Sequence, residues 1–257
     1  MSQPPFPSFI IIGAERAATR WLRINLDQHP DICAPPLEME FFANPDQLRN
    51  RGSRWYREHF SEWHGEPFLG ESTPRYLGGA YRPAELAMRM HRMVPDARLI
   101  AVIRQPLDRL YSAAVRKSLL GLLPPDYDLW TEMNANEGLS PEREALKLDL
   151  IRGGAYNWSL PPYLELYGDR LKVMLYDDLL ADPAAFYREA LVHIGAAPDF
   201  VPDQLERRLF ANPPSDLVDL SRDERAEFYE LWRSALAGFG ELIGRDLSHW
   251  DPLVTIA

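Results

Sequence analysis

The sequence has a single cysteine, Cys33, and a short N-terminal apolar run at residues 9–12. One cysteine excludes an intramolecular disulfide, so a reducing compartment is expected. Four apolar residues are too few for a signal peptide or a membrane-spanning helix. We therefore expect a cytoplasmic protein that does not enter a membrane.

Basic residues are also scarce relative to acidic ones. Lys and Arg number 28 against 38 Asp and Glu, and the net charge is −10. Proteins that bind nucleic acid or membrane surfaces usually carry a basic face, so we expect neither partner. A small anionic ligand remains compatible, because a local arginine cluster can lie within an acidic protein.

A chain of 257 residues with 46% hydrophobic residues is long enough for one sizeable domain, and we expect residues 1–257 to form it. Apolar runs predict strands, listed in chain order as Phe9–Ile12, Pro67–Leu69, Leu99–Ile103 and Leu171–Leu175. Helical patterns separate them, at Ala17–Asp27, Ser53–Phe60, Pro83–Met93, Pro106–Leu119, Pro141–Arg152, Trp158–Tyr167, Pro183–Ile194 and Ser221–Leu242. This alternation predicts an α/β fold, with a mostly parallel central sheet flanked by helices in a P-loop-like three-layer sandwich.

The stretch "FIIIGAERAATRWL", residues 9–22, is typical of a phosphate site. A buried strand, a short loop and a helix N-terminus present backbone N–H groups to an anion. The loop lacks the G-K-[ST] ending of P-loop NTPases, since Ala18, Thr19 and Arg20 stand there. A kinase with a degenerate loop is therefore the weaker alternative.

The stretch "RLIAVIRQPLDRLYS" places Arg104 after a predicted strand and Ser112 on the following helix. An arginine and a hydroxyl in these positions can hold one phosphate, the arginine through two parallel bonds. The structural alternative is that Arg104 pairs with Asp108 and Ser112 only fills a helix position.

Together these motifs resemble the sulfotransferases that use 3′-phosphoadenosine-5′-phosphosulfate (PAPS). The family's G-x-x-[KR]-x-G-T-[TS] and R-x-P-x-[DE]-R-x-x-S motifs are matched by "GAERAATR" and "RQPLDRLYS". "LEMEFF" and "GESTPRY" resemble the family's K-E-x-x-F-F and G-E-x-[ST]-P-x-Y, and "GGAY", "LYDDLLADP" and "LIGRDLSHW" resemble later signatures. The resemblance runs in order from about Phe9 to Trp250.

The resemblance implies a PAPS donor, the product PAP and no metal. It implies that the donor contacts the loop and the helix start, Gly13, Ala14, Glu15, Arg16, Ala17, Ala18, Thr19, Arg20 and Trp21. By the same resemblance Arg16 contacts the phosphate–sulfate bridge and Thr19 the 5′-phosphate, while Arg104 and Ser112 hold the 3′-phosphate. Arg207 and Arg208 are weaker candidates for the adenine side.

The resemblance also assigns the general base to Glu38, with Glu40 as its rival. The structural alternative is that both are solvated carboxylates. The acceptor is implied to be a hydroxyl or amine of a small molecule, lipid or glycan. Candidate acceptor contacts are Glu40, Phe41, Arg75, Tyr76 and Trp158, and the region 120–165 is expected to set specificity.

The sequence departs from the family pattern at Ala18, Arg20 and Leu37, where glycine, a hydroxyl residue and lysine are common. A methyl group at position 18 can crowd a phosphate that approaches the backbone. These departures motivate a second hypothesis, a catalytically impaired protein that binds PAP or a partner.

Overall fold

The computed structural model describes residues 3–36, 38–79, 82–135, 137–206, 220–236 and 238–251. The chain forms two compact units. Unit 1 comprises Met1–Arg104 and Trp158–Phe210, and unit 2 comprises Gln105–Asn157 and Ala211–Ala257. A single domain over residues 1–257 stays a prediction.

Unit 1 is built on a parallel sheet. Within the described residues its five strands are β1 (Phe9–Gly13), β2 (Ile32–Cys33), β3 (Phe68–Ser72), β4 (Arg98–Ile103) and β5 (Leu171–Leu175). Their order across the sheet is β2-β3-β1-β4-β5, and every pair is parallel. Every residue of β1 is buried, as expected for a strand that lies at the centre of such a sheet. The predicted α/β class is confirmed.

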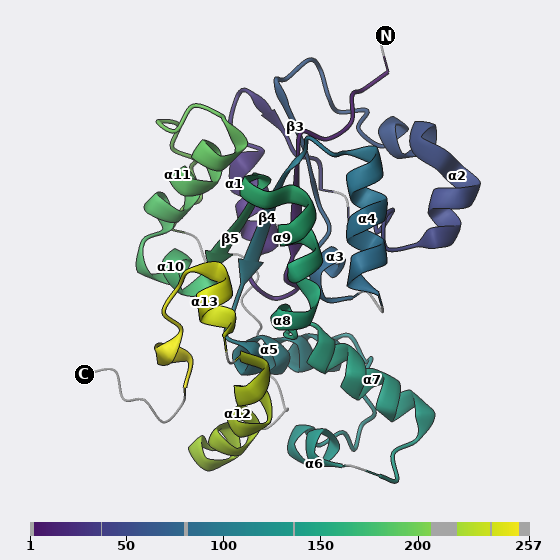
Figure 1. Cartoon of the computed structure of the whole chain (residues 1–257), viewed down its shortest axis with the longest axis vertical. Coiled ribbons are helices and arrows are strands. Elements are labelled where there is room, and N and C mark those ends of the chain that lie inside the picture. The colour runs from purple at the N-terminus through teal and green to yellow at the C-terminus, as the bar shows by residue number, and fades with distance from the viewer. Residues whose placement is uncertain are drawn as a thin grey trace. The chain divides into compact units, whose positions relative to one another are not determined.

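The helices of unit 1 cover both faces of this sheet. They are α1 (Thr19–Leu26), α2 (Pro45–Glu58), α3 (Arg75–Gly78), α4 (Pro83–Met93), α9 (Pro161–Tyr167), η1 (Gly168–Arg170), α10 (Tyr176–Ala181) and α11 (Pro183–Ile194). The chain leaves β1 toward one edge of the sheet and leaves β3 toward the other. Right-handed crossovers therefore put α1 and α4 on opposite faces. In Figure 1, α1 lies with α11 on one face and α4 with α9 on the other.

Strands β1 and β3 are in close contact, with an aromatic ring of β1 packed against a glycine of β3. In the β1–β3 register, Phe9 lies opposite Gly70. A Cβ atom built on Gly70 would overlap atoms of the Phe9 ring. Gly70 thus makes room for the Phe9 ring, which explains why "GES" begins with glycine on a buried strand.

Two predicted helices have different bounds for identifiable backbone reasons. The helix expected from Ala17 begins instead at Thr19, because Ala18 has φ 64 and ψ 20, outside the right-handed helical region. The C-terminal helix expected over Ser221–Leu242 is divided into α12 (Arg222–Leu236) and α13 (Phe239–Ile243). Gly238, at φ 72, precedes α13 and ends the continuous helical path.

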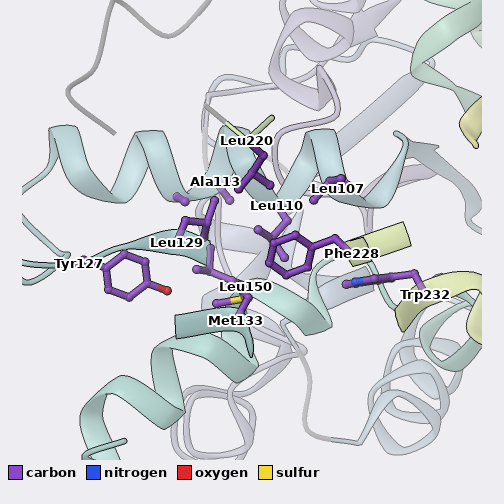
Figure 2. Packing of buried hydrophobic residues seen from close by; sticks show 11 residues of the cluster. Leu107, Leu110, Ala113, Tyr127, Leu129, Met133, Leu150, Leu220, Phe228 and Trp232 are labelled. Carbon is purple, nitrogen blue, oxygen red and sulfur yellow. The ribbon is translucent and has the colours of Figure 1, made fainter. Parts of the chain in front are cut away.

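Unit 2 is helical. It contains α5 (Pro106–Leu119), α6 (Leu129–Asn134), α7 (Pro141–Arg152), α12, α13 and η2 (Ser248–Trp250), and α8 (Tyr156–Ser159) contains one boundary between the units. Figure 2 shows its apolar core, in which Leu110 of α5, Leu150 of α7 and Phe228 of α12 gather. Trp130 of α6 packs edge-on against Phe228, with ring centroids 5.1 Å apart.

Candidate functional site

The β1–α1 loop, residues 14–18, starts at a glycine with no room for a side chain. Gly13 has φ 152, and a Cβ atom there would lie 2.6 Å from Leu77 Cβ and 2.7 Å from the Pro74 carbonyl oxygen. Strand β1 therefore ends in close contact with α3. This contact fixes where the loop leaves the sheet.

Two left-handed residues shape the loop itself. Arg16 has φ 67 and Ala18 has φ 64. The Ala17 N–H donates to the Ala14 carbonyl at 3.2 Å, and the first helical bond of α1 runs from Leu22 N–H to the Ala18 carbonyl at 3.0 Å. Left-handed residues beside right-handed or turn conformations direct successive N–H groups to one side, which forms an anion-binding concavity. The N–H groups of the first turn of α1 have no acceptor within the helix.

The side chains of this stretch divide by burial. Ala14 and Ala17 are completely buried, and Thr19 and Trp21 are each 4% exposed. Trp21 packs edge-on against Phe186 of α11. Glu15, Arg16 and Ala18 are half-buried, and Arg20 is exposed. Cationic side chains thus accompany the loop, although their contact with a donor stays a prediction.

Arg104, which directly follows β4, lies beside this loop in unit 1. Its Nη1 donates to the Arg16 carbonyl at 3.4 Å, and its guanidinium lies 4.7 Å from the centroid of the Tyr176 ring. The carboxyl ends of parallel strands form one edge, so β1 and β4 deliver their following residues to the same place. Arg104 is held there by a backbone oxygen and an aromatic face.

Glu38 is exposed to solvent and lies within electrostatic range of the β1–α1 loop. The surrounding protein removes part of the hydration of its carboxylate and so raises the pKa of Glu38. The negative charges of Glu15 and Glu40 add to the rise, while Arg20 and Arg23 oppose it. A raised pKa brings a carboxylate closer to the range that suits a general base.

Glu40 has a different environment. Its Oε1 lies 3.4 Å from Arg75 Nε in a partly exposed ion pair. Its backbone has φ 47, which redirects the chain between Glu38 and the aromatic residues that follow. Glu40 is therefore the rival base that already has a cationic partner.

The aromatic residues after Glu40 are buried. Phe41 and Phe42 are completely buried, and Phe41 stacks on Tyr56 of α2 at 4.5 Å between centroids. Tyr76 is also completely buried, and Phe42 meets it edge-on. Phe41 and Tyr76 thus anchor the 38–42 segment, and their predicted contact with an acceptor stays a prediction.

The remaining predicted residues are spread over the chain. Trp158 belongs to unit 1 and is exposed, while Ser112 on α5 belongs to unit 2 and is 8% exposed. Because Arg104 lies in unit 1, its joint use with Ser112 stays a prediction. Arg207 and Arg208 lie outside the described residues.

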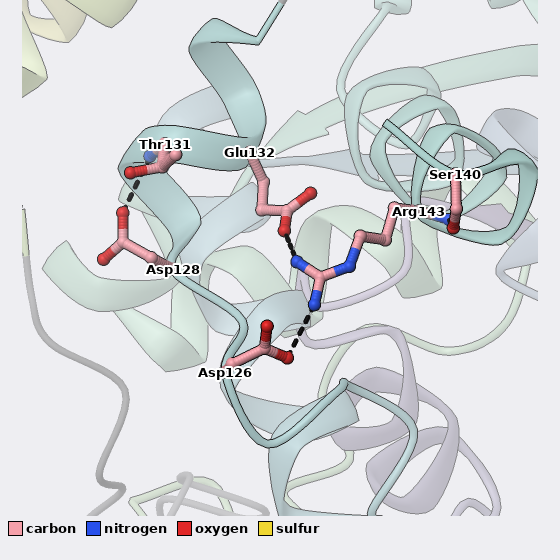
Figure 3. Close-up of polar contacts among 6 residues, drawn as sticks. All are labelled: Asp126, Asp128, Thr131, Glu132, Ser140 and Arg143. Atoms are coloured by element: carbon pink, nitrogen blue, oxygen red, sulfur yellow. Dashed lines mark hydrogen bonds and ion pairs between the residues drawn. The ribbon is translucent and has the colours of Figure 1, made fainter. Parts of the chain in front are cut away.

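Part of the region 120–165 is held by a charged network on α6 and α7. Figure 3 shows the Arg143 guanidinium between Glu132 and Asp126, and its Nη2 lies 2.6 Å from Asp126. Asp128 accepts from the Thr131 N–H at 2.8 Å, and Ser140 caps α7 through the Arg143 N–H. These bonds give the region a defined local structure within unit 2.

The sequence places Glu71 near the end of a predicted strand, but sequence reasoning missed the hydrogen-bond network that buries this residue. Glu71 is 2% exposed and accepts hydrogen bonds from Tyr56, Thr73 and Tyr76. Its burial raises its pKa, while the three hydroxyl donors act in the opposite direction. The signal was polar residues directly continuing a buried strand in "GESTPRY", but the partner Tyr56 lies on another element.

The described ranges hold neither a metal-binding cluster nor a membrane-spanning helix. Among these residues no group of three or more His, Cys, Asp or Glu side chains is placed to hold a metal ion. No helix in the same part of the chain is long and apolar enough to cross a membrane.

Comparison with known sequences identifies sulfotransferases. No family model matches the chain. Heparan sulfate glucosamine 3-O-sulfotransferase 6 of Homo sapiens is 29% identical over 202 residues, which are 76% of this chain and 52% of that protein. Heparan sulfate glucosamine 3-O-sulfotransferase 3B1 of Mus musculus is 30% identical over 192 residues, 74% and 46% respectively. The chain spans about half the length of these curated relatives.

Solved structures give the same result. A sulfotransferase from Alicyclobacillus acidocaldarius matches with a TM-score of 0.79 and 27% identity, over 96% of this chain and 99% of that one. The sulfotransferase domain from the curacin biosynthetic pathway matches with a TM-score of 0.53 at 15% identity, which supports the fold alone. In sequence and in fold, the chain is thus similar to sulfotransferases over most of its length.

Proposed function

We propose that this protein transfers a sulfuryl group from PAPS to a hydroxyl or amine of an acceptor. The observation that carries the proposal is the arrangement within unit 1. Arg16 and Ala18 before α1 have the left-handed conformation that can direct successive N–H groups to one side, and Glu38 lies within electrostatic range of the same loop. Anion-binding backbone and a carboxylate of raised pKa are the two groups that this reaction needs.

The donor site fits an adenosine phosphosulfate. The loop offers backbone N–H groups and the Thr19 hydroxyl to the 5′-phosphate, and Arg104 binds the 3′-phosphate. When bound, PAPS supplies the activated sulfuryl group. A sulfuryl group carries less negative charge than a phosphoryl group, so arginine side chains can replace a metal ion.

Glu38 takes the proton of the acceptor hydroxyl as the acceptor oxygen forms its bond to sulfur. The bond between sulfur and the bridging phosphate oxygen breaks at the same time, and its electron pair leaves with PAP. Arg16 neutralises the charge that develops on that bridging oxygen. A positioned base contributes on the order of 10²- to 10⁴-fold in rate, and a preorganised charged donor about 3 kcal/mol.

The acceptor is proposed to be a glycan or another hydroxyl-bearing molecule. The relatives named heparan sulfate glucosamine 3-O-sulfotransferases support a glycan. The net charge of −10 disfavours a strongly anionic polymer as the acceptor, because like charges repel.

The first experiment is thermal unfolding of the chain with PAP, adenosine 5′-phosphosulfate, ATP and no ligand. A ligand at about 100 times its dissociation constant adds roughly 2.7 kcal/mol of stability. Stabilisation by PAP but not by ATP supports the proposal and removes the kinase alternative. No shift with PAP would contradict it.

The second experiment measures PAPS consumption with a panel of acceptors. Glu38→Gln is expected to keep PAP binding and to lose about 10²- to 10⁴-fold in kcat. Glu40→Gln is the matched control, because this carboxylate already pairs with Arg75. Full activity in Glu38→Gln would instead assign the role of general base to Glu40. PAP binding without turnover in the unmodified chain would favour the catalytically impaired alternative.

A further inference from the structure

Glu71 is the buried hub of a hydrogen-bond network that the proposed chemistry does not use. It lies one residue before the end of β3 with 2% exposure, and its Oε1 accepts from Thr73 Oγ1 and from the Tyr76 hydroxyl, each at 2.7 Å. The Tyr56 hydroxyl bonds to its Oε2. A buried carboxyl is costly unless such partners satisfy it, so its retention calls for a reason.

Two of the three partners of Glu71 hold the backbone of the 38–42 segment. Thr73 Oγ1 accepts from the Met39 N–H at 3.1 Å, and the Tyr76 hydroxyl oxygen accepts from the Phe42 N–H at 3.5 Å. The third partner, Tyr56, carries the ring on which Phe41 stacks. Every donor to Glu71 is thus also a contact of this segment.

We propose that Glu71 is a positioning residue for Glu38, an inference that rests on the proposed function. Glu71 Oε1 accepts the hydroxyl protons of Thr73 and Tyr76. Each hydroxyl oxygen then presents its lone pairs to a backbone N–H of the 38–42 segment. This direction holds in either protonation state of Glu71, since a proton on Oε2 leaves Oε1 an acceptor.

The bond at Met39 matters most, because Met39 directly follows Glu38. On the other side of Glu38, Arg23 Nη1 donates to the Ala34 carbonyl at 2.7 Å, and Asp27 accepts from the Ala34 N–H at 2.7 Å. The chain that bears Glu38 is therefore tied at both ends. A displacement of about 1 Å at a reacting group can cost on the order of 10²-fold in rate.

Thr73 gives the sharpest test, because a pair of variants separates hydroxyl from volume. Thr73→Val keeps the shape of the side chain and removes both hydrogen bonds, whereas Thr73→Ser keeps the hydroxyl. We expect Thr73→Val to lose about 10- to 100-fold in kcat while the Kd for PAP stays within about threefold. Thr73→Ser is expected to restore kcat.

Amide hydrogen exchange provides a readout that needs no activity. In Thr73→Val and in Glu71→Leu, which has no acceptor oxygen, the Met39 amide is expected to lose protection, while the amides of α1 keep theirs. Tyr167→Phe is the control for a lost buried phenol bond, since the Tyr167 hydroxyl donates to the Val94 carbonyl at 3.4 Å rather than to Glu71. This control is expected to leave both kcat and Met39 exchange unchanged.

The two proposals fail in different ways. Unchanged Met39 protection in Thr73→Val, or a loss of kcat no greater than in Tyr167→Phe, overturns the positioning role of Glu71. An unmodified chain that consumes no PAPS overturns the proposed function, and the exchange of Met39 and Phe42 then still decides whether Glu71 orders the segment.

Discussion

Replacing Ala18 by glycine should make this protein more stable, against the usual effect of that change. Ala18 has φ 64 and ψ 20 and directly precedes α1. In this left-handed region the Cβ atom of an L-residue crowds the backbone, at a cost of about 1–2 kcal/mol. Glycine has no Cβ, but its greater freedom in the unfolded chain costs roughly 0.5–1 kcal/mol. The free energy of unfolding should therefore rise by about 0.5–1 kcal/mol.

The neighbouring alanine provides a matched control. Ala17 is completely buried and is not among the residues of positive φ. Glycine there removes a buried methyl group, worth about 0.8 kcal/mol, and adds the same unfolded-state freedom of roughly 0.5–1 kcal/mol. Ala17→Gly should therefore lower the free energy of unfolding by about 1–2 kcal/mol. The same substitution at adjacent positions should have opposite signs.

The assay is urea unfolding followed by tryptophan fluorescence and circular dichroism, with the midpoint and the slope fitted for each chain. A shifted midpoint at unchanged slope reports stability alone. If Ala18→Gly unfolds at a lower urea concentration than the unmodified chain, the left-handed conformation of Ala18 is not a source of strain. An equal loss in the free energy of unfolding in Ala18→Gly and Ala17→Gly would also refute the reasoning.

Three further predictions follow from the site and the core. Because the pKa of Glu38 is raised, activity should fall on acidification at a pH above the ordinary glutamate pKa. In pH–rate profiles, Glu15→Gln should lower this apparent pKa and Arg20→Gln should raise it. Shifts of the same sign in both variants would contradict the assignment of the base to Glu38. Gly13→Ala should lose about 2–3 kcal/mol of stability in urea unfolding, because its Cβ would overlap α3. A loss of stability smaller than that of a surface substitution would contradict the close contact between Gly13 and α3. Phe228→Ala should cost about 3–5 kcal/mol, because this ring is 2% exposed in the core of unit 2, and calorimetry should show the loss in the transition that unfolds unit 2.

Strands could be predicted where an apolar run is long and central. The runs at 9–12, 99–103 and 171–175 became β1, β4 and β5 with bounds changed by at most one residue at an end. Strand β2 has two residues, too few to give a periodic signal. Strand β3 continues to Ser72 through Glu71, a polar residue whose burial depends on partners elsewhere in the chain.

The candidate site could be predicted as far as local sequence determines it. The β1–α1 loop and the position of Arg104 after β4 follow from strand ends, and both are found there. The start of α1 could not be predicted, because alanine rarely adopts the left-handed conformation that Ala18 has. Nor could the network around Glu71, since Tyr56 comes from α2 and stands fifteen residues from its partner.

The loop conformation also explains why a missing glycine is compatible with the proposed anion site. An anion requires that successive N–H groups point to one side, and this direction depends on φ and ψ rather than on the residue type. Ala18 reaches the left-handed conformation that glycine adopts freely, and Arg16 reaches it two residues earlier. The difference between alanine and glycine then lies in the stability of the fold, by about 0.5–1 kcal/mol, rather than in the direction of the N–H groups. Ala18→Gly should accordingly change the urea midpoint more than the affinity for PAP.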